Sequence, residues 1–284
     1  MAAPVVGPEA KGVMRPGRRF YKMSGSGNDF IFFDRDDGPA GELENPRTIA
    51  TLCAHGTGVG ADGVVFLDRT DPARVTISYF NSDGSSGELC GNATLCTIRL
   101  AEILGAAADR GLRIRTDAGE VAGRLVDGVP EIDLEPVTEV SAEWPAIPRA
   151  DSELRLGYAL VGVPHIAIEV PDVAAADVSG RGSLVRRHPS LAHGANVNFL
   201  SRGGDGKWTI RTYERGVERE TLACGTGAVA SAILLSIWER ASSPVRLVTK
   251  SGRDLVVTLR RDGDRWYPSL RGAADLVFTG ELPT

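Results

Sequence analysis

The stretch "SGELCGNATLC", residues Ser86–Cys96, places a cysteine directly before a glycine and an apolar run with helical spacing. A second stretch, "TLACGTGAVAS", residues Thr221–Ser231, has the same arrangement. The two cysteines, Cys90 and Cys224, lie 134 positions apart in the chain (224 minus 90). Each is therefore expected at the start of one long helix, with the helices over residues 92–104 and 227–241.

A second pair of landmarks has almost the same offset. Gly27 in "SGSGNDFIFF" and Gly162 in "LVGVPHIAIE" lie 135 positions apart (162 minus 27). One short motif matches easily by chance, but two matches at nearly one offset are much harder to obtain. An internal duplication of this period predicts two similar domains in tandem.

Short runs of β-branched and aromatic residues between turn signals dominate the rest of the chain. These strand-like runs cover residues 29–34, 63–68, 74–80, 112–119, 120–128, 130–136, 158–170, 196–202, 208–216, 245–252 and 254–261. A third helix is expected over residues 46–53. Two prolines in residues 143–152 mark a crossover between domains. The pattern predicts a disordered tail over residues 1–17, a first domain over 18–145 and a second over 153–284, whose final strand can return to the first.

The composition excludes several classes of protein. With 42% hydrophobic and 24% charged residues in 284, the chain is ordinary for a globular protein of two domains. A net charge of −5 without a basic stripe argues against a nucleic-acid partner, and no apolar run approaches the roughly 18 residues that span a membrane. No signal peptide is expected. Four cysteines form no disulfide scaffold and no zinc pattern, so we expect reduced thiols, no metal and a cytoplasmic protein.

A cysteine followed by glycine at a helix start is chemically useful. The unpaired N–H groups of the first helical turn attract anions, and glycine lets the backbone approach a ligand closely. Two such helix starts facing each other would clamp one carboxylate and place a thiol on each face of the neighbouring carbon. This arrangement suits proton removal on one face and proton delivery on the other, with a modest lowering of the thiol pKa. The other cysteines, Cys53 and Cys96, are expected to pack as small hydrophobic side chains.

Six blocks of the sequence, in order, resemble the diaminopimelate epimerase family of cofactor-independent amino-acid epimerases. The blocks are "MSGSGNDF" (23–30), "GVGADG" (58–63), "YFNSDGSSGELCGNATLC" (79–96), "VGVPH" (161–165), "GANVNF" (194–199) and "YERGVERETLACGTGAVAS" (213–231). The resemblance implies an α+β fold of two tandem pseudo-symmetric domains, each a curved, mostly antiparallel sheet around a long helix. It also implies a homodimeric isomerase that needs no cofactor and acts on a small amino acid.

The resemblance implies a role for each matching position. Cys90 and Cys224 would be the acid/base pair, with His165 and Glu214 close enough to tune the pKa of the thiols. The expected substrate contacts are Asn28 near the amino group, Gly91, Asn92, Gly225 and Thr226 at the carboxylate of the reacting carbon, and Asn81, Asn196, Glu214 and Arg215 at the distal end of the substrate.

Simpler explanations exist for some of these residues. Asn81 in "NSDG" could be a turn residue, His165 could be a core histidine with satisfied hydrogen bonds, and Glu214 with Arg215 could be a solvated ion pair.

The chain also departs from the family pattern. Val163 stands where the family usually has an asparagine, Leu95 where it often has a polar residue, and "ERGVERET" (214–221) is one residue longer than the usual "ERGVGET". These changes leave the two cysteines intact but bear on the pocket for the far end of the substrate.

Three hypotheses remain open from the sequence. The first is interconversion of LL- and meso-diaminopimelate, in the pathway to lysine and peptidoglycan precursors. The second is a sibling racemase or epimerase for another amino acid, in secondary metabolism for example, which Val163 and the lengthened loop favour. The third, a non-catalytic amino-acid binding protein, is disfavoured by two intact Cys-Gly pairs.

Overall fold

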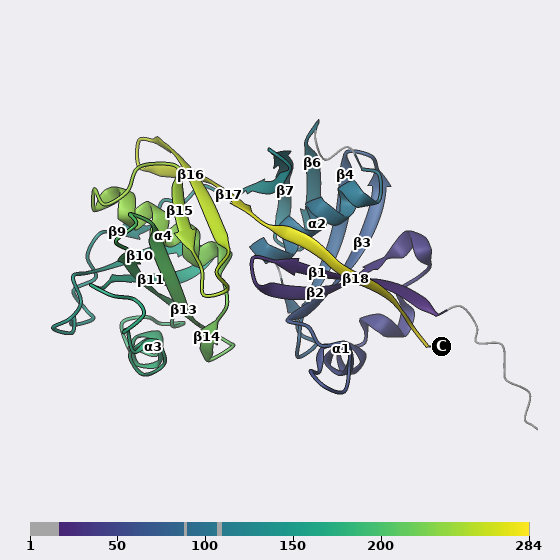
Figure 1. The fold of residues 1–284 in the computed structure, drawn as a ribbon, viewed down its shortest axis with the longest axis horizontal. Helices are drawn as coiled ribbons and strands as arrows, with labels where there is room; N and C mark the ends of the chain where they lie inside the picture. Colours follow the sequence, from purple (N-terminus) through teal and green to yellow (C-terminus); the bar gives the residue numbers. More distant parts are fainter. Residues whose placement is uncertain (1–16, 88–89, 107–109, 284) are drawn as a thin grey trace, which may run out of the picture.

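The computed structural model describes residues 17–87, 90–106 and 110–283, and it confirms a sheet-dominated α+β fold (Figure 1). The predicted tail lies outside these residues, apart from Gly17. Within the described residues, no helix is long and apolar enough to cross a membrane.

The first half of the chain contains eight strands and two helices. They are β1 (Arg18–Gly25), β2 (Asn28–Asp34), α1 (Pro46–Cys53), β3 (Gly63–Asp71), β4 (Arg74–Asn81), β5 (Ser86–Gly87), α2 (Gly91–Ile103), β6 (Leu112–Thr116), β7 (Gly119–Val126) and β8 (Val129–Asp133), with 3-10 turns η1 (Arg35–Asp37) and η2 (Gly41–Glu44).

The second half continues with ten strands and two helices. They are β9 (Val140–Ser141), β10 (Arg155–Val161), β11 (Val163–Glu169), α3 (Val178–Arg186), β12 (Asn196–Arg202), β13 (Trp208–Glu214), β14 (Arg219–Thr221), α4 (Gly225–Ile237), β15 (Val245–Val248), β16 (Asp254–Asp262), β17 (Arg265–Gly272) and β18 (Ala274–Leu282).

The strand pairing of the first half is repeated in the second. The pairs β1–β2 and β3–β4 are antiparallel, and β2–β3 and β4–β6 are parallel. In the same order, β10–β11 and β12–β13 are antiparallel, and β11–β12 and β13–β15 are parallel. Each half wraps its sheet around one long helix, α2 or α4. The duplication inferred from the sequence is therefore a duplication of topology.

The two halves are joined by strands that cross between them. The last strand, β18, runs back over the first half and pairs with β1, while the short β9 pairs with β10 in the second half (Figure 1). Between the halves, β17 pairs with β8. Because hydrogen-bonded strands hold a fixed register, these pairings hold α2 and α4 in a defined relation to each other.

The matched glycines lie in equivalent turns of the two halves. Gly27, with φ of 115°, joins β1 to β2, and Gly162, with φ of 66°, joins β10 to β11. The stretch 158–170, expected as one strand-like run, is therefore wrong as a single strand: it lies in two antiparallel strands. A positive φ favours glycine, which explains why glycine occupies both turns.

Helix α3 was not expected from the sequence, because it has few apolar residues and contains two glycines that lower helix propensity. Asp177 caps its first turn by accepting a hydrogen bond from the N–H of Gly180 at 2.8 Å. Gly182 lies so close to Tyr213 of β13 that a Cβ atom would come within 2.6 Å of the Tyr213 Cβ. Packing against the sheet, rather than local propensity, stabilises this helix.

Leu270 on β17 lies beneath both long helices. Its side chain is completely buried, and a Cβ atom added to Gly91 or Gly225 would lie 3.4 Å or 2.9 Å from its Cδ2 atom. This one side chain therefore supports the first turn of α2 and of α4 together.

We expect Leu270→Ala to lower the free energy of unfolding by about 2–5 kcal/mol, because it removes a buried side chain and leaves a cavity between the two helix starts. Urea denaturation measures the change. Leu184→Ala is the matched control, because Leu184 is 70% exposed, and its effect is expected within about 0.5 kcal/mol. A loss below about 1 kcal/mol for Leu270→Ala would show that this side chain does not hold the helix starts.

Candidate active site

Cys90 and Cys224 occupy the same position in the two halves, the residue directly before a long helix. Their backbones are extended, with φ and ψ of −127° and 114° at Cys90 and −137° and 111° at Cys224, and neither side chain caps its helix. By contrast, Asn45 caps α1 with its side chain. The first turns of α2 and α4 therefore keep N–H groups that no capping side chain occupies.

The starts of α2 and α4 meet at their glycines. A Cβ atom on Gly225 would lie 3.8 Å from the Cα atom of Gly91 and 3.6 Å from the Oδ1 atom of Asn92. Any side chain at either glycine would enter this contact. The geometry thus places the two Cys-Gly pairs, which are far apart in the sequence, at one location.

Withdrawal from water controls the protonation of both thiols, of which Cys224 is buried and Cys90 is partly buried. It raises the pKa of the Cys90 thiol to about 11, although the N–H groups of Ala93 and Asn92 lower it. It raises the pKa of Cys224 to about 12, and the Thr226 hydroxyl, 3.6 Å from the sulfur, acts in the opposite direction. The modest lowering of the pKa expected from the helix starts is therefore wrong, because the loss of hydration outweighs the helix N–H groups.

Glu214, the last residue of β13, lies in electrostatic range of both cysteines. Its negative charge raises the pKa of each thiol further, and burial followed by the charge of Asp62 raises the pKa of Glu214 itself. The site thus combines two neutral thiols with a carboxyl group that has been partly withdrawn from water.

A directed chain of hydrogen bonds connects three side chains next to Cys90. Asn28 donates from Nδ2 to the Asp62 Oδ2 atom at 2.9 Å, and Asn92 donates from Nδ2 to the Asn28 Oδ1 atom at 2.6 Å. An ionised carboxylate only accepts hydrogen bonds, so Asp62 fixes the orientation of both amides. The Asn92 Oδ1 atom is buried and has no hydrogen-bond partner among the described residues, so it remains an acceptor directed toward the start of α4.

His165 is completely buried on β11, directly beside Asn196 of β12 in the parallel register. Asn198 donates from Nδ2 toward the His165 Nδ1 atom at 3.3 Å, which leaves Nδ1 as the acceptor. Burial, with a smaller effect from the charge of Arg215, lowers the pKa of His165 to about 3. The imidazole is therefore neutral at physiological pH, and its tuning of the thiols stays a prediction.

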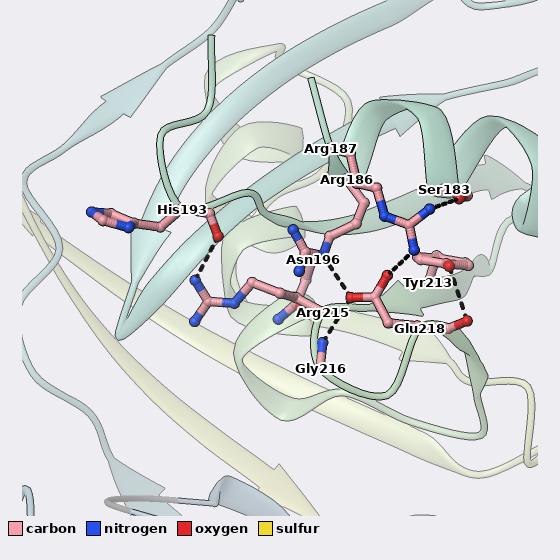
Figure 2. A network of polar contacts seen from close by, with 9 residues as sticks. All are labelled: Ser183, Arg186, Arg187, His193, Asn196, Tyr213, Arg215, Gly216 and Glu218. Atoms are coloured by element: carbon pink, nitrogen blue, oxygen red, sulfur yellow. Dashed lines mark hydrogen bonds and ion pairs between the residues drawn. The ribbon is translucent and has the colours of Figure 1, made fainter. Parts of the chain in front are cut away.

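Asn196 and Arg215 lie together, and their contact with a substrate stays a prediction. The Arg215 N–H donates to the Asn196 Oδ1 atom at 2.7 Å, and the Arg215 guanidinium donates to the His193 carbonyl at 3.2 Å (Figure 2). Asn81 is held within its own turn, where it donates to Ser85 Oγ at 3.0 Å. The turn explanation for Asn81 thus has a structural basis, and its contact with a substrate stays a prediction.

Three residues of the site were missed by sequence reasoning. Asp62 orients the amides beside Cys90, Asn198 fixes His165, and Tyr79 donates its hydroxyl proton to Asn81 at 3.0 Å; burial and then the charge of Cys90 raise the pKa of Tyr79. All three lie inside the six blocks of the sequence. Nothing in the block "GVGADG" singles out Asp62, because its contacts are formed with residues distant in the chain. Across residues 17–87, 90–106 and 110–283, no group of three or more His, Cys, Asp or Glu residues could hold a metal ion.

A family model and individual relatives indicate the same family for this sequence. A family model described as "Diaminopimelate epimerase" matches residues 20–132 and 157–277. The diaminopimelate epimerase of Gemmatimonas aurantiaca is 43% identical over 275 residues, which cover 93% of this chain and 98% of the relative. That of Archaeoglobus fulgidus is 38% identical over 275 residues, with coverage of 93% and 95%.

Solved structures share the fold at low sequence identity. A phenazine biosynthesis protein of the PhzF family from Bacillus anthracis is 17% identical, with a TM-score of 0.69 and coverage of 95% of this chain and 100% of that chain. A hydroxyproline epimerase from Agrobacterium vitis is 16% identical, with a TM-score of 0.63 and coverage of 93% and 92%. These matches confirm the predicted fold class.

The raised thiol pKa values predict how the free protein reacts with iodoacetamide. Because only the thiolate is alkylated and burial holds both pKa values near 11 or 12, labelling of Cys90 and Cys224 should be slow at pH 8 and should rise steeply up to pH 11. Mass spectrometry of the labelled peptides measures the rate at each cysteine. Labelling of either cysteine that is already maximal at pH 8 would contradict this account.

Proposed function

The chain belongs to the diaminopimelate epimerase family, and from this premise we propose that it interconverts LL- and meso-diaminopimelate without a cofactor. One observation carries the proposal: Cys90 and Cys224 stand at the starts of two helices that meet at Gly91 and Gly225. A carbon bound between these starts would have one thiol on each side. The identity of the substrate is inferred from the relatives that are named diaminopimelate epimerase.

The proposed reaction moves two protons. A thiolate on one side removes the α-proton and becomes a thiol, while the electron pair of the broken C–H bond remains on the substrate carbon. The thiol on the opposite side then donates its proton to that carbon and becomes a thiolate. The configuration is inverted, and the two cysteines exchange roles between the forward and reverse directions.

The helix starts would hold the carboxylate next to the reacting carbon. The first-turn N–H groups at Gly91, Asn92, Gly225 and Thr226 face a site without a capping side chain, and they can stabilise negative charge as it develops. Asn28, held by Asp62 and Asn92, would contact the ammonium group of the reacting carbon, and Glu214 supplies an anion for the ammonium group at the distal end. Arg215 and Asn196 supply a cation and an amide for the distal carboxylate.

A second candidate is a sibling epimerase with another amino-acid substrate. Val163 supplies no hydrogen bond where the family usually has an asparagine, and the loop after Arg215 has an extra residue. Both changes lie where the far end of the substrate would bind, so they bear on substrate choice and leave the thiol chemistry unchanged.

We also propose a cytoplasmic homodimer. The cysteines of the described residues are free thiols, which a reducing compartment preserves. The edge strand β18 exposes Val277 at 57% and Phe278 at 46%, and an exposed apolar edge strand is a surface for pairing with a second chain. Fractionation of cells that finds the protein outside the cytoplasm would contradict the first part.

Solvent deuterium should enter the α-position of LL-diaminopimelate when it is incubated with reduced protein in D2O, because each turnover replaces the α-proton. Mass spectrometry measures this incorporation for LL-diaminopimelate and for a panel of L-amino acids. Exchange with diaminopimelate alone supports the proposal, and exchange with a different amino acid alone supports the sibling.

Variants of the two cysteines test the proposed two-thiol mechanism. Cys90→Ala and Cys224→Ala should each lower epimerisation by at least about 10³-fold, because either change removes one proton carrier. Cys53→Ala is the matched control for loss of a buried thiol and should retain activity. Full turnover in either active-site variant would rule out the two-thiol mechanism.

Val277→Asp should convert the dimer to a monomer, because it places a charge on the exposed edge of β18. Sedimentation velocity measures the mass of the particle. Leu184→Asp, at an exposed site on α3, is the control and should leave the mass unchanged. A wild-type protein that sediments as a monomer would exclude the dimer.

A further inference from the structure

The loop after β13, within residues 214–221, is one residue longer than the usual family sequence. This loop is bonded to the end of α3. Glu218 accepts hydrogen bonds at Oε1 from the Arg186 Nε atom at 2.9 Å and from the Gly216 N–H at 3.1 Å. Its Oε2 atom accepts from Arg187 at 2.8 Å (Figure 2). Both oxygens of this carboxylate therefore accept hydrogen bonds, from the loop itself or from the arginines at the end of α3.

The backbone of Glu218 is held as firmly as its side chain. Its φ of 57° lies in the left-handed region, which residues other than glycine rarely adopt without supporting contacts. Its N–H donates to the Glu214 carbonyl at 2.8 Å, and its carbonyl accepts from the Tyr213 hydroxyl at 2.9 Å. These bonds close the loop from Glu214 to Glu218 into one compact turn.

Arg186 connects this turn to a second segment of the site. Its carbonyl accepts a hydrogen bond from the Ala195 N–H at 3.4 Å, and a Cβ atom at Gly194 would meet the Arg186 side chain at 2.0 Å. Gly194 has a φ of 65°, so glycine is required there both by conformation and by space. The next residue after Ala195 is Asn196, which accepts the hydrogen bond from the Arg215 N–H.

The contacts form a closed ring. They run from Glu218 to Arg186, along residues 194–196 to Asn196, and back through Arg215 and Gly216 to Glu218. Two proposed substrate contacts, Asn196 and Arg215, are members of this ring. Their relative position is therefore set by a carboxylate that lies in the lengthened loop.

We propose that Glu218 is a positioning residue, which fixes Arg215 and Asn196 for the distal end of the substrate. The inference rests on the proposed function. Glu218 itself contacts no reacting atom, so its loss should weaken substrate binding more than it slows proton transfer. The side chain of Val163 donates no hydrogen bond where the family usually has an asparagine, so recognition of the distal end depends on the fixed position of these two groups.

The test compares Glu218→Ala and Glu218→Gln with the control Glu220→Gln. Glu220 lies close by in the chain, but it pairs with Arg211 and Lys250 and does not contact the ring. Epimerisation of diaminopimelate gives kcat and KM, and hydrogen–deuterium exchange of the peptides covering residues 193–196 and 213–218 reports the ring directly.

Glu218→Ala should raise KM by about tenfold, change kcat by less than about threefold, and speed amide exchange in both peptides. Glu218→Gln keeps an acceptor for the Gly216 N–H but loses the charge, so its KM should lie between wild type and Glu218→Ala. The Glu220→Gln control should stay within about twofold of wild type in kcat and KM and leave exchange in these peptides unchanged. If Glu218→Ala does not fold, the Gln variant decides.

Two results would overturn the proposal. An unchanged KM in both Glu218 variants would do so, even if amide exchange becomes faster, because the ring would then serve the fold alone. An equal rise of KM in the Glu220→Gln control would do so as well. Wild-type protein that is inert toward diaminopimelate marks a failure of the proposed function instead. The comparison is then made with the amino acid that does exchange, and if none does, the positioning role is wrong too.

Discussion

The contact between Gly91 and Gly225 is the constraint on which the site depends. Each helix start carries roughly half a positive charge, so two starts in contact repel each other unless an anion lies between them. The repulsion is overcome by the sheet: β8 pairs with β17, and Leu270 fills the space below both glycines. The fold thus holds together two groups that favour an anion, and this is the physical basis for binding a carboxylate there.

The crossing strands explain why the two halves act as one unit. A chain made of two independent domains would join α2 and α4 only through a linker, and their starts could separate freely. Here β18 pairs with β1 and β17 pairs with β8, so backbone hydrogen bonds cross the boundary at two places. Separation of the helix starts therefore requires the sheet to bend or to lose its pairing.

The duplication could be predicted from the sequence because it is visible in the spacing of a few motifs. The two Cys-Gly pairs and the two turn glycines keep nearly one offset, and these features also place the long helices. The contacts of Asp62 and Asn198 could not be predicted, because their partners are distant in the chain or on a neighbouring strand. Asp62 bonds to Asn28 across 34 residues, and Asn198 meets His165 across 33. Helix α3 was missed for a related reason: Gly182 packs against Tyr213 of β13, and this contact between distant residues is not visible in local helix propensity.

Burial of the thiols raises the question of how one becomes a base. At pH 7, deprotonating a thiol with a pKa of about 11 costs about 5 kcal/mol, at 1.36 kcal/mol for each pH unit. An ammonium group bound about 4 Å away contributes about 4 kcal/mol at an effective dielectric constant of 20. The two magnitudes are close, so the ammonium group offsets most of that cost, provided that the N–H groups of the two helix starts neutralise the carboxylate on the same carbon. Binding of the ammonium group and formation of the thiolate are therefore coupled: each stabilises the other.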